Sequence, residues 1–126
     1  MTHPAEHRSV FLPGGLRLHV VNYGLQEGDP VLLLHGWPQT SYAWRRVGPL
    51  LAAAGLRVIA PDLRGFGDSS RPEIGFDKKT VARDLHELLC ELAIERAWVV
   101  GHDMGGHVAY PFAAQGPDMV RGLVFI

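Results

Sequence analysis

The chain has 126 residues, of which 47% are hydrophobic and 20% are charged, and its formal net charge is -1. This length allows one domain with a real core and is too short for two. The near-neutral charge gives no electrostatic reason to expect a nucleic acid or an anionic membrane as a partner, and we expect neither. The single cysteine, Cys90, excludes an internal disulfide and is expected to be buried among neighbouring leucines.

The first nine residues predict a flexible polar arm. They contain no apolar stretch of the kind found in a secretory leader, and the whole chain has no run of about 18 apolar residues. We therefore expect an arm at residues 1–9, one domain over residues 10–126, and a reducing, cytoplasmic setting.

Two short segments after the arm predict an antiparallel hairpin. Residues 10–12 are apolar, residues 13–15 (PGG) form a turn, and residues 16–21 (LRLHVV) largely alternate between apolar and polar side chains. Such alternation is typical of a strand with one face on the core and the other in water. A polar, turn-rich loop follows at residues 24–30.

The rest of the chain alternates apolar strands with helices. Strands are expected at 31–34, 58–60, 97–100 and 120–126, and helices at 42–54, 77–92 and 106–115. Pro49 makes the first of these helices the least regular. Strand–helix–strand alternation with strands that are apolar on both faces indicates a parallel sheet with right-handed crossovers.

The chain ends inside an apolar strand, residues 120–126. An unpaired apolar strand at the edge of a sheet is a template for pairing with another chain. We therefore expect the sequence to be truncated, and we expect the exposed strand to favour self-association.

The segment Gly101-His102-Asp103-Met104-Gly105 carries the chemistry. It lies between a predicted strand and a predicted helix, and it has the Gly-x-Asp-x-Gly form of a nucleophile elbow with aspartate at its centre. Gly101 and Gly105 flank a turn in which larger side chains would collide. The helix that starts near Met104 directs N–H groups and the positive end of its dipole at Asp103, which favours a carboxylate. Alone, the pattern also fits a loop in which Asp103 caps the helix.

Two further motifs, each directly after a predicted strand, favour the elbow. They are HGWP at residues 35–38 and PDLRGFGDS at residues 61–69. With all three motifs in order, the chain resembles the α/β-hydrolase fold family, specifically its epoxide hydrolase and haloalkane dehalogenase branch. The resemblance covers nearly all of residues 10–126. It implies the N-terminal part of an α/β-hydrolase fold, in which an antiparallel hairpin leads into a parallel sheet with flanking helices, truncated before the lid and the C-terminal catalytic residues.

The resemblance also implies roles for individual residues. Asp103 would be the nucleophile, and the backbone N–H groups of Trp37 and Met104 would form the oxyanion hole. Residues 61–69 would brace the site. The residues implied as structural support of the site are His35, Gly36, Pro38, Gly101 and Gly105. No metal or other cofactor is implied, and the family's catalytic base and acid would lie beyond Ile126.

Aspartate at the elbow indicates alkyl transfer instead of acyl transfer. With a reference pKa near ~3.9, a carboxyl is ionised at neutral pH, whereas a serine hydroxyl needs a histidine to take its proton. A carboxylate can displace a leaving group from an sp³ carbon and form an alkyl–enzyme ester. We therefore expect an epoxide hydrolase that acts on a small apolar electrophile, an epoxide or alkyl halide, through an ester on Asp103. Without the base and acid, turnover by these 126 residues is not expected.

Two alternatives stay open. The first is a haloalkane or haloacetate dehalogenase. Haloalkane dehalogenases often have Asn after the HG pair and Trp after the nucleophile as halide donors, where this chain has Trp37 and Met104, and a methionine side chain has no donor. HGWP is commoner among epoxide hydrolases, although that branch also often has Trp where Met104 stands. The second alternative is a non-catalytic fragment that needs a partner half, as the terminal strand suggests. His102 and His107 are interpreted as structural.

Overall fold

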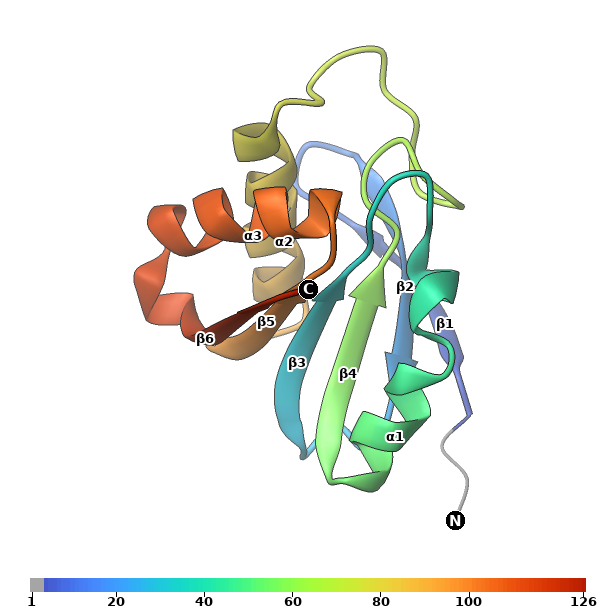
Figure 1. Ribbon diagram of the computed structural model, residues 1–126. Coiled ribbons are helices and arrows are strands. Elements are labelled where there is room, and N and C mark those ends of the chain that lie inside the picture. The colour runs from blue at the N-terminus through green and yellow to red at the C-terminus, as the bar shows by residue number, and fades with distance from the viewer. Residues whose placement is uncertain (1–3) are drawn as a thin grey trace.

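The computed structural model describes residues 4–126 and contains a six-stranded mixed sheet with helices on both faces (Figure 1). The strands are β1 (Glu6–Phe11), β2 (Arg17–Tyr23), β3 (Asp29–Leu34), β4 (Leu56–Pro61), β5 (Ala97–Gly101) and β6 (Val120–Phe125). Their order in the sheet is β1-β2-β4-β3-β5-β6. The β1–β2 and β2–β4 pairs are antiparallel, whereas the β3–β4, β3–β5 and β5–β6 pairs are parallel. The predicted hairpin that leads into a parallel sheet is confirmed.

The helices divide between the two faces of the sheet. α1 (Val47–Ala53) lies on one face, and α2 (Lys78–Glu91) and α3 (Met104–Gln115) lie on the other (Figure 1). Short 3-10 helices at Ser41–Trp44 and Pro117–Met119 precede α1 and β6. Within residues 4–126, none of the helices has both the length and the apolar character needed to span a membrane.

Each face of the sheet has its own buried cluster. Leu32 and Leu34 of β3 belong to the cluster under α2 and α3, whereas Val31 and Leu33 belong to the cluster under α1. Successive residues of a strand point to opposite faces, so a strand that is covered on both sides needs a continuous apolar run. The apolar positions of α2 recur at helical spacing on the face that packs on the sheet: Val81, Leu85, Leu88, Leu89.

Three expectations are corrected by the structure. β1 begins at Glu6, which lies opposite Asn22 of β2, so residues 6–9 of the expected arm belong to the sheet. Residues 1–3 of that arm lie outside the described residues. The helix expected at 42–54 is divided into a 3-10 helix and α1. Pro49 is the third residue of α1, where an N–H has no partner within the helix. Cys90 is exposed, because its side chain is on the outer face of α2.

The parallel strands bring the three sequence motifs together. β3, β4 and β5 all end at the same edge of the sheet, because parallel strands share their direction. The segments that follow them begin at residues 35, 62 and 102, and each contains one of the motifs found in the sequence. Open parallel sheets bind their ligands at this edge, so the site is built here.

Candidate active site

Asp103 occupies a strained turn between β5 and α3. Its backbone angles are φ 55° and ψ −118°, in the region of positive φ that residues other than glycine rarely adopt. The Gly105 N–H donates to the His102 carbonyl at 2.8 Å, and the Gly106 N–H donates to the Asp103 carbonyl at 3.0 Å. The turn leaves Asp103 exposed beyond the end of β5, so its carboxylate is accessible to a ligand.

Two glycines allow α3 to start directly against the end of the sheet. A Cβ on Gly105 would overlap the Leu34 carbonyl oxygen and lie 2.8 Å from that of His35. A Cβ on Gly101 would lie 2.6 Å from the Gly105 carbonyl oxygen. Both distances are shorter than a Cβ tolerates, so the turn requires glycine at these two positions.

The loop after β3 lies directly against the Asp103 carboxylate. The Trp37 N–H donates to Asp103 Oδ2 at 3.1 Å. Gly36 permits this approach, because a Cβ there would lie 2.7 Å from the Asp103 Cβ. The backbone N–H groups of Met104 and Trp37 hold the pKa of Asp103 below its usual value, so its carboxyl is ionised at neutral pH. Both backbone donors implied by the resemblance therefore face the same carboxylate.

The side chains next to these donors point elsewhere. Met104 packs against the buried cluster under α2 and α3, so only its backbone faces Asp103. The Trp37 side chain is 69% exposed, and Pro38 is exposed beside it. The hydrogen bonds to the carboxylate consequently come from backbone N–H groups, whose positions do not depend on side-chain rotamers.

His35 fixes the loop after β3 to the end of β4. The side chain is fully buried. Its Nδ1–H donates to the Gly36 carbonyl at 2.9 Å, and its Nε2 accepts from the Leu63 N–H at 3.0 Å. This arrangement requires the neutral imidazole with the proton on Nδ1. Burial lowers the pKa of His35, although the Gly36 carbonyl and the Asp62 charge act in the opposite direction.

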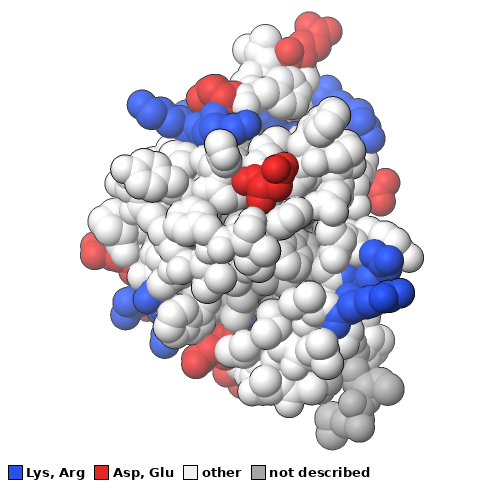
Figure 2. All heavy atoms as spheres, in the orientation of Figure 1, with Lys and Arg blue, Asp and Glu red and all other residues white. Residues whose placement is uncertain are grey.

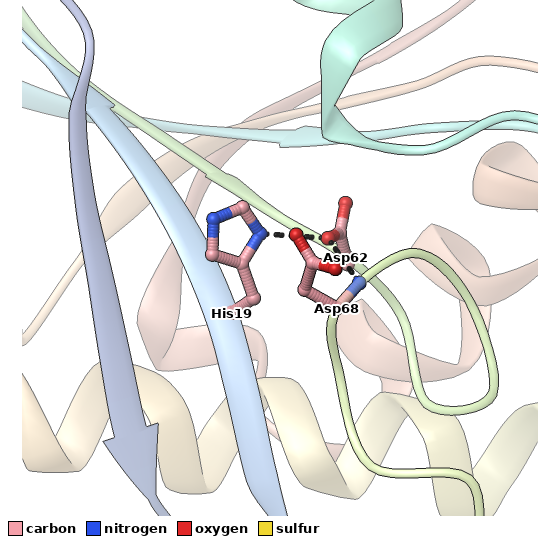
Figure 3. A group of neighbouring side chains, drawn as sticks. All are labelled: His19, Asp62 and Asp68. Carbon is pink, nitrogen blue, oxygen red and sulfur yellow. Dashed lines mark hydrogen bonds and ion pairs between the residues drawn. The ribbon is translucent and has the colours of Figure 1, made fainter.

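Asp62, in the segment after β4, is the second anchor of that loop (Figure 3). Its Oδ1 accepts from the Ser41 N–H at 2.7 Å. Its Oδ2 accepts from the Asp68 N–H at 3.0 Å and from His19 Nδ1–H at 2.7 Å. Burial alone would raise the pKa of Asp62, but these donors outweigh it and lower the pKa. The residue is 2% exposed, so we assign it a structural role.

His19 was not found by sequence reasoning as a partner of Asp62. It lies on β2, 43 positions before Asp62, and no local pattern links the two residues. His19, Asp62 and Asp68 each offer one ligand atom, and these atoms lie within 4.8 Å of one another. However, an ion between the imidazole and the two carboxylates would have to displace the hydrogen bond from His19 to Asp62. This arrangement therefore favours a hydrogen-bonded cluster over a metal centre at that position.

An open hollow of about 570 Å³ adjoins Asp103. Its lining combines apolar and polar side chains from α3, the start of α2 and the last residues of the chain: Lys78, His107, Tyr110, Phe125, Ile126. The surface over this part of the molecule is mostly uncharged (Figure 2). His107 lies on exposed α3 surface, and the His102 N–H donates to the Leu34 carbonyl at 3.1 Å. A small, largely apolar molecule can therefore reach Asp103.

Comparison with known proteins gives the family. A family model described as the alpha/beta hydrolase fold matches residues 29–126. The chain belongs to the α/β-hydrolase fold family. Within this family it is 50% identical over 112 residues to a soluble epoxide hydrolase of Corynebacterium sp. (strain C12), covering 89% of the chain and 38% of that protein. It is 42% identical over 116 residues to epoxide hydrolase B of Mycobacterium tuberculosis, covering 89% of the chain and 33% of that protein.

A solved structure agrees with this family assignment. The crystal structure of epoxide hydrolase A from Mycobacterium thermoresistibile superposes with a TM-score of 0.92 at 38% identity. The match covers 97% of this chain and 39% of that chain. This α/β-hydrolase chain thus spans 33% and 38% of the length of the two curated relatives. Over 39% of the length of the solved structure it has the same fold.

Neighbouring glycines of α3 offer a matched test of the elbow. We expect Gly105→Ala to lower the free energy of unfolding by about 2 kcal/mol, because its Cβ meets the backbone of β3. Gly106→Ala should be neutral or stabilising by up to about 1 kcal/mol, because alanine favours helix. Its Cβ would lie 3.3 Å from the exposed Phe125 ring and make an ordinary contact with the Gly101 carbonyl oxygen at 3.6 Å. Urea unfolding measures both. Equal effects of the two substitutions would contradict the close approach.

The buried neutral His35 predicts a pH dependence of stability. Because the pKa of His35 in the folded chain lies below its ordinary value of 6.5, the unfolded chain binds more protons between those two values. Stability is then complete above about pH 6.5 and falls as the pH is lowered toward 5, with a limiting slope of about 1.4 kcal/mol per pH unit for each such imidazole. His86, whose pKa is also lowered by burial, acts in the same direction.

Urea unfolding between pH 5 and pH 7.5 measures this slope. His35→Gln keeps an acceptor for the Leu63 N–H but does not titrate, so we expect a shallower slope. His107→Gln, on the exposed surface of α3, should keep the parent slope. A parent protein that is equally stable across this range would rule out the prediction.

Proposed function

We propose that Asp103 is the nucleophile of an epoxide hydrolase, and that the N–H groups of Trp37 and Met104 form its oxyanion hole. The observation that carries this proposal is the contact between the Trp37 N–H and Asp103 Oδ2 at 3.1 Å, on a carboxylate whose pKa is lowered by backbone donors. The similarity to epoxide hydrolases at 42% and 50% identity supports the same activity.

The two carboxylate oxygens of Asp103 have different roles in the proposed reaction. Oδ2 accepts from the Trp37 N–H, which leaves Oδ1 as the attacking atom. In the first step Oδ1 forms a bond to an epoxide carbon and the bond from that carbon to the epoxide oxygen breaks. The epoxide oxygen leaves as an alkoxide and takes a proton from water. The product is a hydroxyalkyl ester of Asp103, in which Oδ2 is the carbonyl oxygen.

The same donors serve the second step. When water attacks the carbonyl carbon of the Asp103 ester, negative charge develops on Oδ2. The Trp37 N–H already donates to that atom, and the Met104 N–H is the second donor to the same carboxylate. Donors that already point at the developing charge stabilise the transition state without reorganisation. Water must be activated by a base. Among residues 4–126, no hydrogen bond joins a histidine to Asp103, so we propose that this chain forms the ester faster than it hydrolyses it.

Met104 supports an epoxide over a halide as the substrate. A halide leaving group needs side-chain donors beside the nucleophile, and the Met104 side chain packs into the core and has no donor. The supporting residues we propose are His35, Gly36, Pro38, Gly101 and Gly105. The single exposed cysteine is compatible with the reducing cytoplasmic setting that we also propose.

A second candidate function is that of a half-domain that associates through its incompletely covered sheet. β6 is an edge strand, and Val124 and Phe125 on it are 47% and 56% exposed. Trp98 on the adjacent β5 is 42% exposed. Apolar side chains on an edge strand favour pairing with another chain, and we propose that two copies of this chain pair along β6.

Alkylation of Asp103 tests the proposed activity. We expect the folded chain, incubated with styrene oxide, to gain the mass of one epoxide molecule, located by mass spectrometry on the peptide that contains residue 103. Asp103→Asn is the matched control, because the amide has a similar shape and is a poor nucleophile. A folded parent chain that remains unmodified, or an Asp103→Asn chain that is modified equally, would refute the assignment.

Pairing along β6 predicts a concentration-dependent dimer. Val124→Lys should weaken this association, because a charged side chain on an edge strand opposes pairing. Leu50→Lys is the matched control, since Leu50 is 71% exposed but lies on α1, away from β6. Sedimentation velocity over a series of concentrations measures both. A parent chain that stays monomeric, or equal effects of the two lysines, would contradict the pairing.

A further inference from the structure

Two histidines face each other across the β1–β2 hairpin. His7 Nδ1 lies 2.9 Å from His19 Nε2. The two ring planes are within 19° of each other and their centroids are 5.1 Å apart. The two ring centres are farther apart than the two facing nitrogens by about the width of one imidazole ring, as expected if the nitrogens lie on the line between the centres. The rings therefore meet edge to edge through these two nitrogens and are not stacked face to face.

Asp62 fixes the tautomer of the His19 ring. The His19 Nδ1–H donates to Asp62 Oδ2 at 2.7 Å, and the second ring nitrogen points away from both carboxylates (Figure 3). In the neutral imidazole, Nε2 then carries a lone pair and no proton. A carboxylate that accepts from one nitrogen of a histidine fixes its tautomer and makes the other nitrogen a better metal ligand.

We propose that His7 Nδ1 and His19 Nε2 bind a divalent transition-metal ion such as Zn²⁺, Ni²⁺ or Cu²⁺. With Zn–N bonds of about 2.0–2.1 Å in tetrahedral geometry, two ligating nitrogens lie about 3.3 Å apart. The present separation of 2.9 Å is therefore only a few tenths of an ångström too short. His7 is exposed on an edge strand, so its ring can tilt to bring both lone pairs onto one ion.

The surroundings admit the ion and its water ligands. An open hollow of about 280 Å³ adjoins the pair and is lined by both histidines, Asp62 and Asp68. The exposed Asp68 carboxylate adds negative charge beside it. Imidazole ligands select zinc, nickel and copper, whereas Mg²⁺ and Ca²⁺ prefer oxygen ligands. This site leaves the hydrogen bond from His19 to Asp62 intact, unlike an ion between His19, Asp62 and Asp68.

The proposal departs from the expectation that the chain binds no metal. The two histidines are 12 positions apart in the sequence, and Asp62 follows His19 by 43. Only the pairing of β1 with β2, and of β2 with β4, brings His7, His19 and Asp62 next to one another. A bound ion would tie β1 to β2, and through Asp62 and Ser41 to the loop that carries Trp37.

Calorimetric titration of the complete, tag-free chain with ZnCl₂ and MgCl₂ at pH 7.5 tests the site. We expect one Zn²⁺ per chain and no binding of Mg²⁺. His7→Gln should weaken Zn²⁺ binding at least about tenfold, because one imidazole alone makes a poor site. His107→Gln is the matched control, since it removes another exposed histidine and should bind Zn²⁺ as the parent does.

Nuclear magnetic resonance gives a second readout that does not depend on affinity. Cu²⁺ added well below one equivalent should broaden the ring signals of His7 and His19 before those of other histidines. The proposal is overturned if the parent binds Zn²⁺ more weakly than about 1 mM, if His7→Gln binds as tightly as the parent, or if Cu²⁺ first broadens other histidines. In that case the pair is a hydrogen bond only.

Discussion

The contact between the first turn of α3 and the end of β3 is the constraint on which the rest of the site depends. Gly105 brings the helix backbone against the carbonyls of Leu34 and His35, so the helix start and the loop after β3 share one position. The turn at Asp103 has to adopt positive φ to make this crossing. The strain and the close approach have the same result, which is a carboxylate held above the sheet and beside the Trp37 N–H.

Two aspartates at this edge of the sheet, Asp62 and Asp103, lie in contrasting environments. Asp62 is buried, and its carboxylate accepts hydrogen bonds from Ser41, Asp68 and His19. We therefore assign its charge a structural role. Asp103 is exposed, and its charge is stabilised chiefly by the backbone N–H groups of Met104 and Trp37. The pKa of each is lowered, but only Asp103 is exposed at the surface, where a ligand can reach it. Environment, and not residue type, separates the two roles.

The loop that carries Trp37 is anchored at both of its ends to consecutive residues after β4. His35, at its start, accepts from Leu63, and Ser41, at its end, donates to Asp62. The Trp37 N–H therefore belongs to a loop whose two ends are both fixed to the segment after β4. Such anchoring suits a group that must be directed at a developing charge before the reaction begins. The exposed end of β6 adjoins the site from the other side, because Phe125 and Ile126 line the hollow beside Asp103.

Local patterns in the sequence were sufficient for the hairpin, the parallel sheet, the helix α2 and the location of Asp103 after β5. Hydrophobic periodicity and the spacing of glycines are local properties, and an elbow needs only a strand, five residues and a helix. The sequence could not indicate that Glu6–Ser9 join the sheet, because their pairing depends on β2. It also could not indicate that the Met104 side chain packs inward or that His19 meets Asp62 and His7. These contacts join residues from different elements that lie far apart in the sequence, so only the tertiary structure, through the register of the sheet and the packing of α3, decided them.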